Sequence, residues 1–357
     1  MPSGLSLNSI MLSIHAAGSA NHRQDLVALS ASGQSVPHQY CDFSDPDALW
    51  CRIASDGRVR SGFLVRVQRS RAVPGTRLLR VERFGRGLHQ PLLPEIGSIL
   101  RELIQYVGRV LRLNVELFDE DQEGRAATLA ALMGAGMRRT PSRSYRETLR
   151  LRLGAGPAEV FGTLSSSTRR NVRTAERSGL VVAAIDSVEY VPRLRAMYVE
   201  TFRRTGAEPP PLDLDAMMSS SIDDARARVF GVFAADRIEP EGLAAFAWVR
   251  SHGDYASYDV AASTRLPELG RTPVGYPLLW RTVEWAMSSG HCWFDLGGVL
   301  PESAPSSHPL AGISAFKLGF SGDRVVVGDE LMLEPSTMLR GMGTLSQHLA
   351  SIVRAAK

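Results

Sequence analysis

The nonapeptide Gly312-Ile-Ser-Ala-Phe-Lys-Leu-Gly-Phe320 carries Lys317, the single internal lysine of the chain. The other lysine is the C-terminal Lys357, whereas arginine occurs 39 times (41 basic residues less the two lysines). Lysine presents a compact charge on a flexible stem and arginine a rigid fork, so a site that must reach one developing negative charge distinguishes between them. Taken alone, a rare lysine is more simply explained as a survivor of a composition biased toward arginine. The segments around it change that balance.

Strand and helix patterns alternate on both sides of this nonapeptide. Residues 274–289 have the apolar spacing of a helix, and 293–296 have the pattern of a short strand. The first half follows the same order, with strands expected at 61–67, 76–81 and 111–117 and a helix at 91–113. We therefore expect an α/β protein with two tandem domains of related design, without a coiled-coil arm. The expected division is a poorly patterned segment at 1–35, an N-terminal domain at 36–155 and a C-terminal domain at 156–357.

The bulk composition is that of an ordinary soluble globular protein. A length of 357 residues exceeds the usual size of one core, which favours two domains. The formal charge of +4 is mildly basic and favours anionic partners without being diagnostic of nucleic acid. Three widely spaced cysteines argue against a disulfide framework, and no metal-binding spacing occurs. We find no membrane-spanning run and no basic leader at the start, so the cytoplasm is the expected location.

An arginine-rich stretch at 165–179, SSSTRRNVRTAERSG, is a candidate phosphate-binding segment. Its serines are suited to cap a helix, and Gly179 is suited to end it. Arg169, Arg170 and Arg173 fall at spacings that let them share a helical face. Arginine binds phosphate oxygens in pairs, which supports a phosphate clamp. An ordinary solvated helix face is an equally good explanation of the same pattern.

Two further segments are candidates. In Gly270-Arg-Thr-Pro-Val-Gly275, glycines and a proline precede an expected helix start, where the helix dipole favours an anion; this marks Arg271 and Gly275. The signal matches no P-loop or dinucleotide fingerprint, and a plain junction explains it equally. In Gly290-His-Cys-Trp-Phe-Asp-Leu-Gly-Gly298, Asp295 follows an expected strand and precedes two glycines. It could orient a substrate amine, although a turn cap is the simpler role.

In order along the chain, four segments resemble the Fem-type aminoacyl transferases, the peptidoglycan interpeptide-bridge ligases and their relatives within the GNAT superfamily. They are STRRNVRTAERSGLVV, MYVETFRRTGAEPPPL, YDVAASTRLPELGRTPVGYPLLWRTVEWAMSSGHCWFDLGG and GISAFKLGF. The resemblance covers roughly residues 60–335, since the first half is similar to the family's N-terminal GNAT-like domain. It implies two GNAT-like domains with the acceptor held in or beside the cleft between them. The shorter, armless members fit better than those with a coiled-coil arm.

The resemblance also implies roles for particular residues. Phe316 and Lys317 match the family's aromatic-Lys motif, which implies that Phe316 lines the site and that Lys317 lies near the reacting carbonyl or the tRNA end. Tyr258 falls close to the family's active-site tyrosine, and Arg204 falls where acceptor contacts are expected. The chain departs from the coenzyme A signature of typical GNAT proteins, because Arg265-Leu-Pro-Glu-Leu-Gly-Arg-Thr-Pro-Val-Gly275 stands in its place. This departure puts a coenzyme A donor in doubt and favours tRNA.

The expected activity is transfer of an aminoacyl group from aminoacyl-tRNA to an amine acceptor, a cell-wall precursor or a natural-product intermediate. No covalent enzyme intermediate, permanently bound cofactor or metal is expected; aminoacyl-tRNA, or acyl-CoA, serves as co-substrate. Asp295, the acceptor or water would take the proton. One alternative is an acyl-CoA-dependent N-acyltransferase acting on a sugar amine or amino acid. A non-catalytic ligand-binding module is another. The sequence indicates neither the group transferred, nor the acceptor, nor the oligomeric state.

Overall fold

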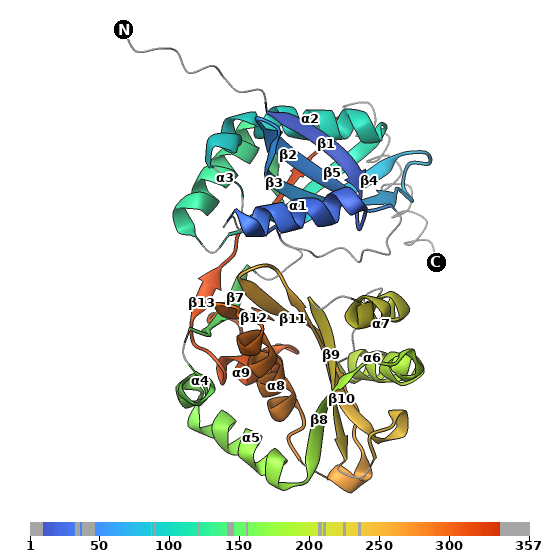
Figure 1. The fold of residues 1–357 in the computed structure, drawn as a ribbon, viewed down its shortest axis with the longest axis vertical. Coiled ribbons are helices and arrows are strands. Elements are labelled where there is room, and N and C mark those ends of the chain that lie inside the picture. Colours follow the sequence, from blue (N-terminus) through green and yellow to red (C-terminus); the bar gives the residue numbers. More distant parts are fainter. Residues whose placement is uncertain are drawn as a thin grey trace. The chain divides into compact units, whose positions relative to one another are not determined.

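The computed structural model describes residues 10–335, except 33–35, 38–46, 87, 89, 120, 141–145, 155, 206–208, 210–211, 224–225, 235–236 and 271. The chain folds into two compact units, each described here by itself (Figure 1). One comprises residues 1–146 and 327–357, and the other comprises 147–326. The candidate Arg271 lies outside the described residues, as does a helix expected at 338–356.

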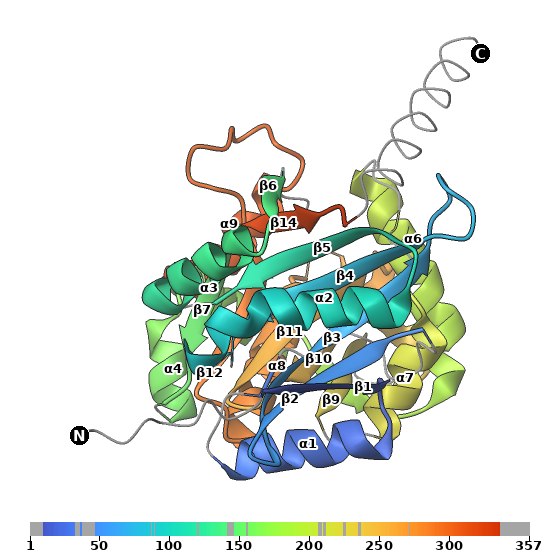
Figure 2. The same cartoon turned by 90° about the horizontal axis from the view of Figure 1, so that it is seen from above.

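The first unit is a seven-stranded mixed sheet in the order β1-β2-β3-β4-β5-β14-β6. Only β4 and β5 pair in parallel; the other neighbours are antiparallel. Helices α2 and α3 pack on one face around a core that includes Leu79, Leu103 and Val115, and α2 runs across β4 and β5 in Figure 2. The strands are β1 (Met11–Ala16), β2 (Leu49–Ser55), β3 (Arg58–Arg69), β4 (Arg77–Gly85), β5 (Val110–Phe118), β6 (Arg138–Thr140) and β14 (Glu330–Leu333), and the helices are α1 (Ala20–Ala31), α2 (Ile96–Val107) and α3 (Gln122–Gly134).

The second unit has a seven-stranded sheet in the order β13-β7-β12-β11-β10-β9-β8, with β11 and β12 parallel. Helices α4, α5, α8 and α9 lie on one side of the sheet and α6 and α7 on the other (Figure 1). The strands are β7 (Glu147–Arg152), β8 (Leu180–Ile185), β9 (Ala227–Ala234), β10 (Leu243–Ser251), β11 (Tyr255–Ser263), β12 (Trp293–Gly298) and β13 (Arg324–Val326). The helices are α4 (Pro157–Thr163), α5 (Ser166–Arg177), α6 (Val191–Thr205), α7 (Leu214–Asp223), α8 (Gly275–Ser288) and α9 (Ala311–Leu318).

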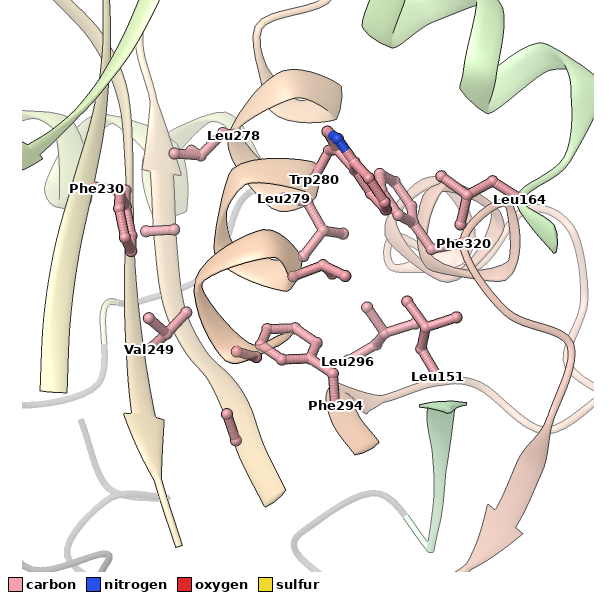
Figure 3. Packing of buried hydrophobic residues seen from close by; sticks show 14 of the residues in the cluster. Leu151, Leu164, Phe230, Val249, Leu278, Leu279, Trp280, Phe294, Leu296 and Phe320 are labelled. Carbon is pink, nitrogen blue, oxygen red and sulfur yellow. The ribbon is translucent and has the colours of Figure 1, made fainter. Parts of the chain in front are cut away.

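The core of the second unit is built around α8. Leu279 and Val283, four residues apart, are fully buried on the face that meets the sheet. Phe294 and Leu296 alternate along β12 and point into the same core, together with Phe320 after α9 (Figure 3). Burying each such side chain stabilises the fold by roughly 1.5–3 kcal/mol. The end of β12 and the α9 segment are thereby held by one core.

The expected α/β architecture with two tandem mixed sheets flanked by helices is confirmed, and none of the described helices forms a coiled-coil arm. Some boundaries differ. The helix expected at 91–113 is a 3₁₀ helix at Gln90–Glu95 followed by α2 at Ile96–Val107, because Pro94 has no N–H to donate within an α-helix. Among the described helices, none is both long and apolar enough to cross a membrane.

Candidate functional site

Lys317 lies in the last turn of α9 with only 8% of its surface exposed. Its Nζ donates a hydrogen bond to the carbonyl oxygen of Gly298 at 3.1 Å, at the end of β12. The preceding residue, Gly297, has φ +79°, and a Cβ added to it would lie 3.1 Å from Nζ. A left-handed glycine therefore lets the β12 backbone approach the ammonium closely.

Asp295, within β12, stabilises the same end of the strand through its side-chain hydrogen bonds. Its side chain is fully buried, and Oδ1 accepts the Gly297 amide at 2.8 Å and the hydroxyl of Thr148 on β7. The carboxylate thus caps the turn formed by Gly297 and Gly298. Sequence reasoning missed Thr148, because its partner lies 147 residues away and no local pattern marks the pair.

Tyr258 comes to the same place from β11. The parallel pairing of β11 and β12 runs only from Tyr255–Trp293 to Ser257–Asp295, so Tyr258 is the first β11 residue beyond it. Its carbonyl oxygen would lie 3.4 Å from a Cβ on Gly297. The side chain is partly buried against the core of the unit, and desolvation raises the pKa of its phenol, which favours the protonated form.

Aromatic side chains surround Phe316 one residue before the lysine. Its ring meets that of Tyr276 edge-on at 4.9 Å and that of Phe320 at 5.5 Å. Gly275, the first residue of α8, also faces it, since a Cβ there would lie 3.7 Å from two carbons of the Phe316 ring. Lys317, Asp295, Tyr258, Phe316 and Gly275 therefore gather where β12, α8 and α9 meet. Tyr276 was missed; it stands at an apolar position of an expected helix, where an aromatic residue gives no separate signal.

The three predicted arginines of α5 do not share one role. Arg169 turns back toward α4, where Nη1 donates to the carbonyl oxygens of Gly162 at 2.7 Å and Leu164 at 2.5 Å. Arg170 and Arg173 are exposed, and the Arg173 guanidinium lies 5.3 Å from the centre of the Phe161 ring. A further exposed arginine, Arg177, follows on the same helix.

Arg204 lies apart from these groups in the described contacts. It stands at the end of α6, where Nη2 donates to the Ser263 carbonyl oxygen at 2.9 Å, at the last residue of β11. No contact among the described residues brings it beside Lys317. Likewise, no group of three His, Cys, Asp or Glu side chains in the described part of the chain is arranged to hold a metal ion.

The site lies within a segment that matches a known domain. Residues 164–317 match the model of the acetyltransferase (GNAT) domain, a range that runs from the residue before the α5 cap to Lys317. No curated protein matches the sequence.

Solved structures align with most of the chain, including residues of both units. A crystal structure of FemX aligns over 94% of this chain and 99% of its own length, with a TM-score of 0.74 and 13% identity. L-PGS from Bacillus licheniformis aligns over 92% and 96%, with a TM-score of 0.54 and 14% identity. A tandem GNAT protein from the clavulanic acid biosynthesis pathway aligns over 92% and 100%, with a TM-score of 0.51 and 16% identity. At these identities the likeness shows a shared fold.

Proposed function

We propose that the chain is a GNAT-type acyltransferase and that it transfers an aminoacyl group from aminoacyl-tRNA to an amine acceptor. The proposed acceptor is a cell-wall precursor or a natural-product intermediate, and the reaction needs no covalent enzyme intermediate. Location in the cytoplasm, where charged tRNA is found, is part of this proposal.

The observation that carries the choice of donor is the loop before α8. A phosphate-binding turn at a helix start needs free backbone amides. Here the amides of Leu269, Gly270, Thr272 and Val274 donate to carbonyl oxygens of residues 266, 267, 269 and 272 in the same loop. Pro273 has no amide hydrogen to offer. These four described amides are thus used within the loop and not offered to the pyrophosphate of coenzyme A, and this favours an ester on tRNA.

In the proposed reaction the acceptor nitrogen attacks the ester carbonyl carbon. The new C–N bond forms, an oxyanion develops, and the ester C–O bond then breaks as the ribose hydroxyl leaves with a proton. We assign Lys317 to the oxyanion or to the leaving oxygen, a role worth about 3–4 kcal/mol for one such donor. Holding the two partners in attack geometry supplies several kcal/mol more.

Asp295 enters the proposal as a positioning residue. Because its Oδ1 already accepts the Gly297 amide and the Thr148 hydroxyl, its observed contacts serve the turn on which Lys317 rests. We therefore assign the proton of the attacking amine to the acceptor itself or to water. Phe316 and Gly275 form the wall beside the lysine, and Tyr258 provides a protonated phenol on the β11 side.

A second candidate function is acyl transfer from acyl-CoA, favoured by the match to an acetyltransferase domain model. One experiment separates the two donors. The purified protein is mixed with a panel of amine acceptors and either a charged tRNA pool or labelled acyl-CoA. Product that forms only with charged tRNA, and that is lost after RNase treatment, supports the proposal. Product from acyl-CoA that survives RNase overturns it in favour of the second candidate.

A further inference from the structure

The solvent face of α5 carries a ladder of arginines that the chemistry at Lys317 does not use. Arg170, Arg173 and Arg177 are all exposed and follow at spacings of three and four residues, which places them on one helix face. We propose that this arginine ladder is the docking surface for the phosphodiester backbone of an RNA, the co-substrate of the function proposed above. The inference rests on that function for the identity of the RNA, and its test does not require acyl transfer.

The charge of the ladder is available for a ligand. Helix α5 carries four arginines against one acidic residue, Glu176. None of the ion pairs found among the described residues uses Arg170, Arg173 or Arg177. Arg169 differs, since its guanidinium is engaged with two carbonyl oxygens at the α4 junction. Three unneutralised guanidinium groups in a row repel one another unless an anion lies along them.

The shape of the surface favours a long anion over a compact one. A groove of about 340 Å³ is lined by Ser166, Arg169, Arg170, Arg173, Thr174 and Arg177, all from the one helix. A small cofactor is normally enclosed on most sides, and no second element of the described part of the chain lines this groove. From Arg170 to Arg177 the helix rises about 10 Å, so the ladder presents its charges along a line. A sugar–phosphate backbone has that form.

The ladder is also connected to the lysine segment. The Ser165 amide, at the cap of α5, donates to the carbonyl oxygen of Gly319 at 2.9 Å. The Thr168 Oγ1 atom, in the first turn, would lie 2.3 Å from a Cβ added to Gly319, so the Thr168 side chain packs closely against the Gly319 backbone. Gly319 comes two residues after Lys317. One end of an RNA bound along α5 would therefore lie beside the segment that carries the Lys317 ammonium.

The test measures binding of fluorescently labelled, uncharged tRNA to the full chain by anisotropy over a series of KCl concentrations. Three arginines that each contact one phosphate should contribute about 2–3 to the slope of log Kd against log salt. We expect the triple variant R170Q/R173Q/R177Q to lose that amount of slope. The matched control R195Q/R237Q/R281Q removes the same charge from exposed, ion-paired arginines of the same unit and should keep the wild-type slope.

The outcomes separate this inference from the proposed function. An unchanged slope in the ladder variant, an equal loss in the control, or no tRNA binding by the wild type would overturn the docking surface. So would ladder-dependent binding of coenzyme A that displaces the tRNA. Ladder-dependent tRNA binding in a protein that transfers only from acyl-CoA would leave the surface standing and refute the donor.

Discussion

The Lys317 ammonium and the Gly298 carbonyl oxygen form a 3.1 Å hydrogen bond that joins the end of α9 to the end of β12. The bond fixes the position of the ammonium group of the single internal lysine. This partner is a backbone carbonyl oxygen, which carries no formal charge. A charge held in this way suits the stabilisation of an anion that exists only during reaction.

Replacing this lysine should reduce turnover far more than donor binding. We expect K317M to lower kcat by about 10²- to 10³-fold, the cost of one oxyanion donor, while KM for the donor changes by less than about threefold. K317R should not restore the rate, because the nearby Gly297 backbone leaves little room for a guanidinium. Steady-state kinetics with charged tRNA measures both constants, and K357M is the control lysine. A K317M enzyme with wild-type kcat would exclude the assigned role.

Gly297 should be needed for activity in a way that Gly290 is not. Both glycines have φ +79°, so alanine at either position costs about 1–2 kcal/mol of backbone strain. A Cβ on Gly297 would meet the Lys317 Nζ at 3.1 Å, whereas one on Gly290 would meet no atom within 4 Å. G297A should lower both stability and kcat, the latter by about tenfold or more (~1.4 kcal/mol). G290A should lower stability alone; equal activities in the two variants would contradict the argument.

The sequence predicted the architecture because its apolar periodicities are strong in both halves. It did not predict α1 within the poorly patterned segment 1–35. On the buried side of that helix, His22 and Asp25 occupy positions at which apolar residues would have produced a recognisable helical periodicity. A distant group satisfies Asp25, which accepts the Trp50 indole N–H at 2.8 Å, and His22 stacks on the same ring. Partners of this kind become visible only once β2 lies beside the helix.

The sequence marked Lys317 as a candidate because family resemblance and local chemistry coincide there, and its role stays a prediction. Sequence spacing could not predict different contacts for Arg169 and Arg170. They are adjacent on the helix and differ only in the direction in which their side chains project. One points at the α4 carbonyl oxygens and the other into solvent. The pairing of β14 with β5 of the first unit, after the whole second unit, also carries no local signal.

Thr148 should stabilise the fold through the Asp295 carboxylate. T148V keeps the side-chain shape and removes the hydroxyl donor from a fully buried carboxylate, which should destabilise the unit by about 1–3 kcal/mol. T282V is the matched control, because the equally buried Thr282 hydroxyl donates only to the Leu279 carbonyl oxygen of its own helix. The T282V substitution should reduce the free energy of unfolding by less than T148V does, with a difference of about 1 kcal/mol or more. Denaturant unfolding compares the two, and equal losses would deny a special role to the Thr148–Asp295 pair.

Unfolding of the second unit should depend on pH through His291. Its Nδ1 lies 3.0 Å from the Gly253 carbonyl oxygen and donates to it, while the buried Nε2 has no partner among the described residues. Burial lowers the pKa of the imidazole in the folded state below its ordinary value. As the pH falls through the unfolded pKa of about 6.5, the unfolded chain binds a proton that the folded chain refuses. Stability should therefore fall below about pH 6.5 and level off beneath the folded pKa.

Asparagine at this position tests the effect, since H291N can keep a donor for Gly253 without titrating. Four of the five tryptophans lie in this unit, at 248, 280, 285 and 293, so their fluorescence reports its denaturant unfolding. Between pH 8 and pH 5, H291N should lose less stability than the wild type. H15N makes the same change at a partly exposed histidine of the first unit and should keep the wild-type loss. A wild-type pH dependence in H291N would place the titrating group elsewhere.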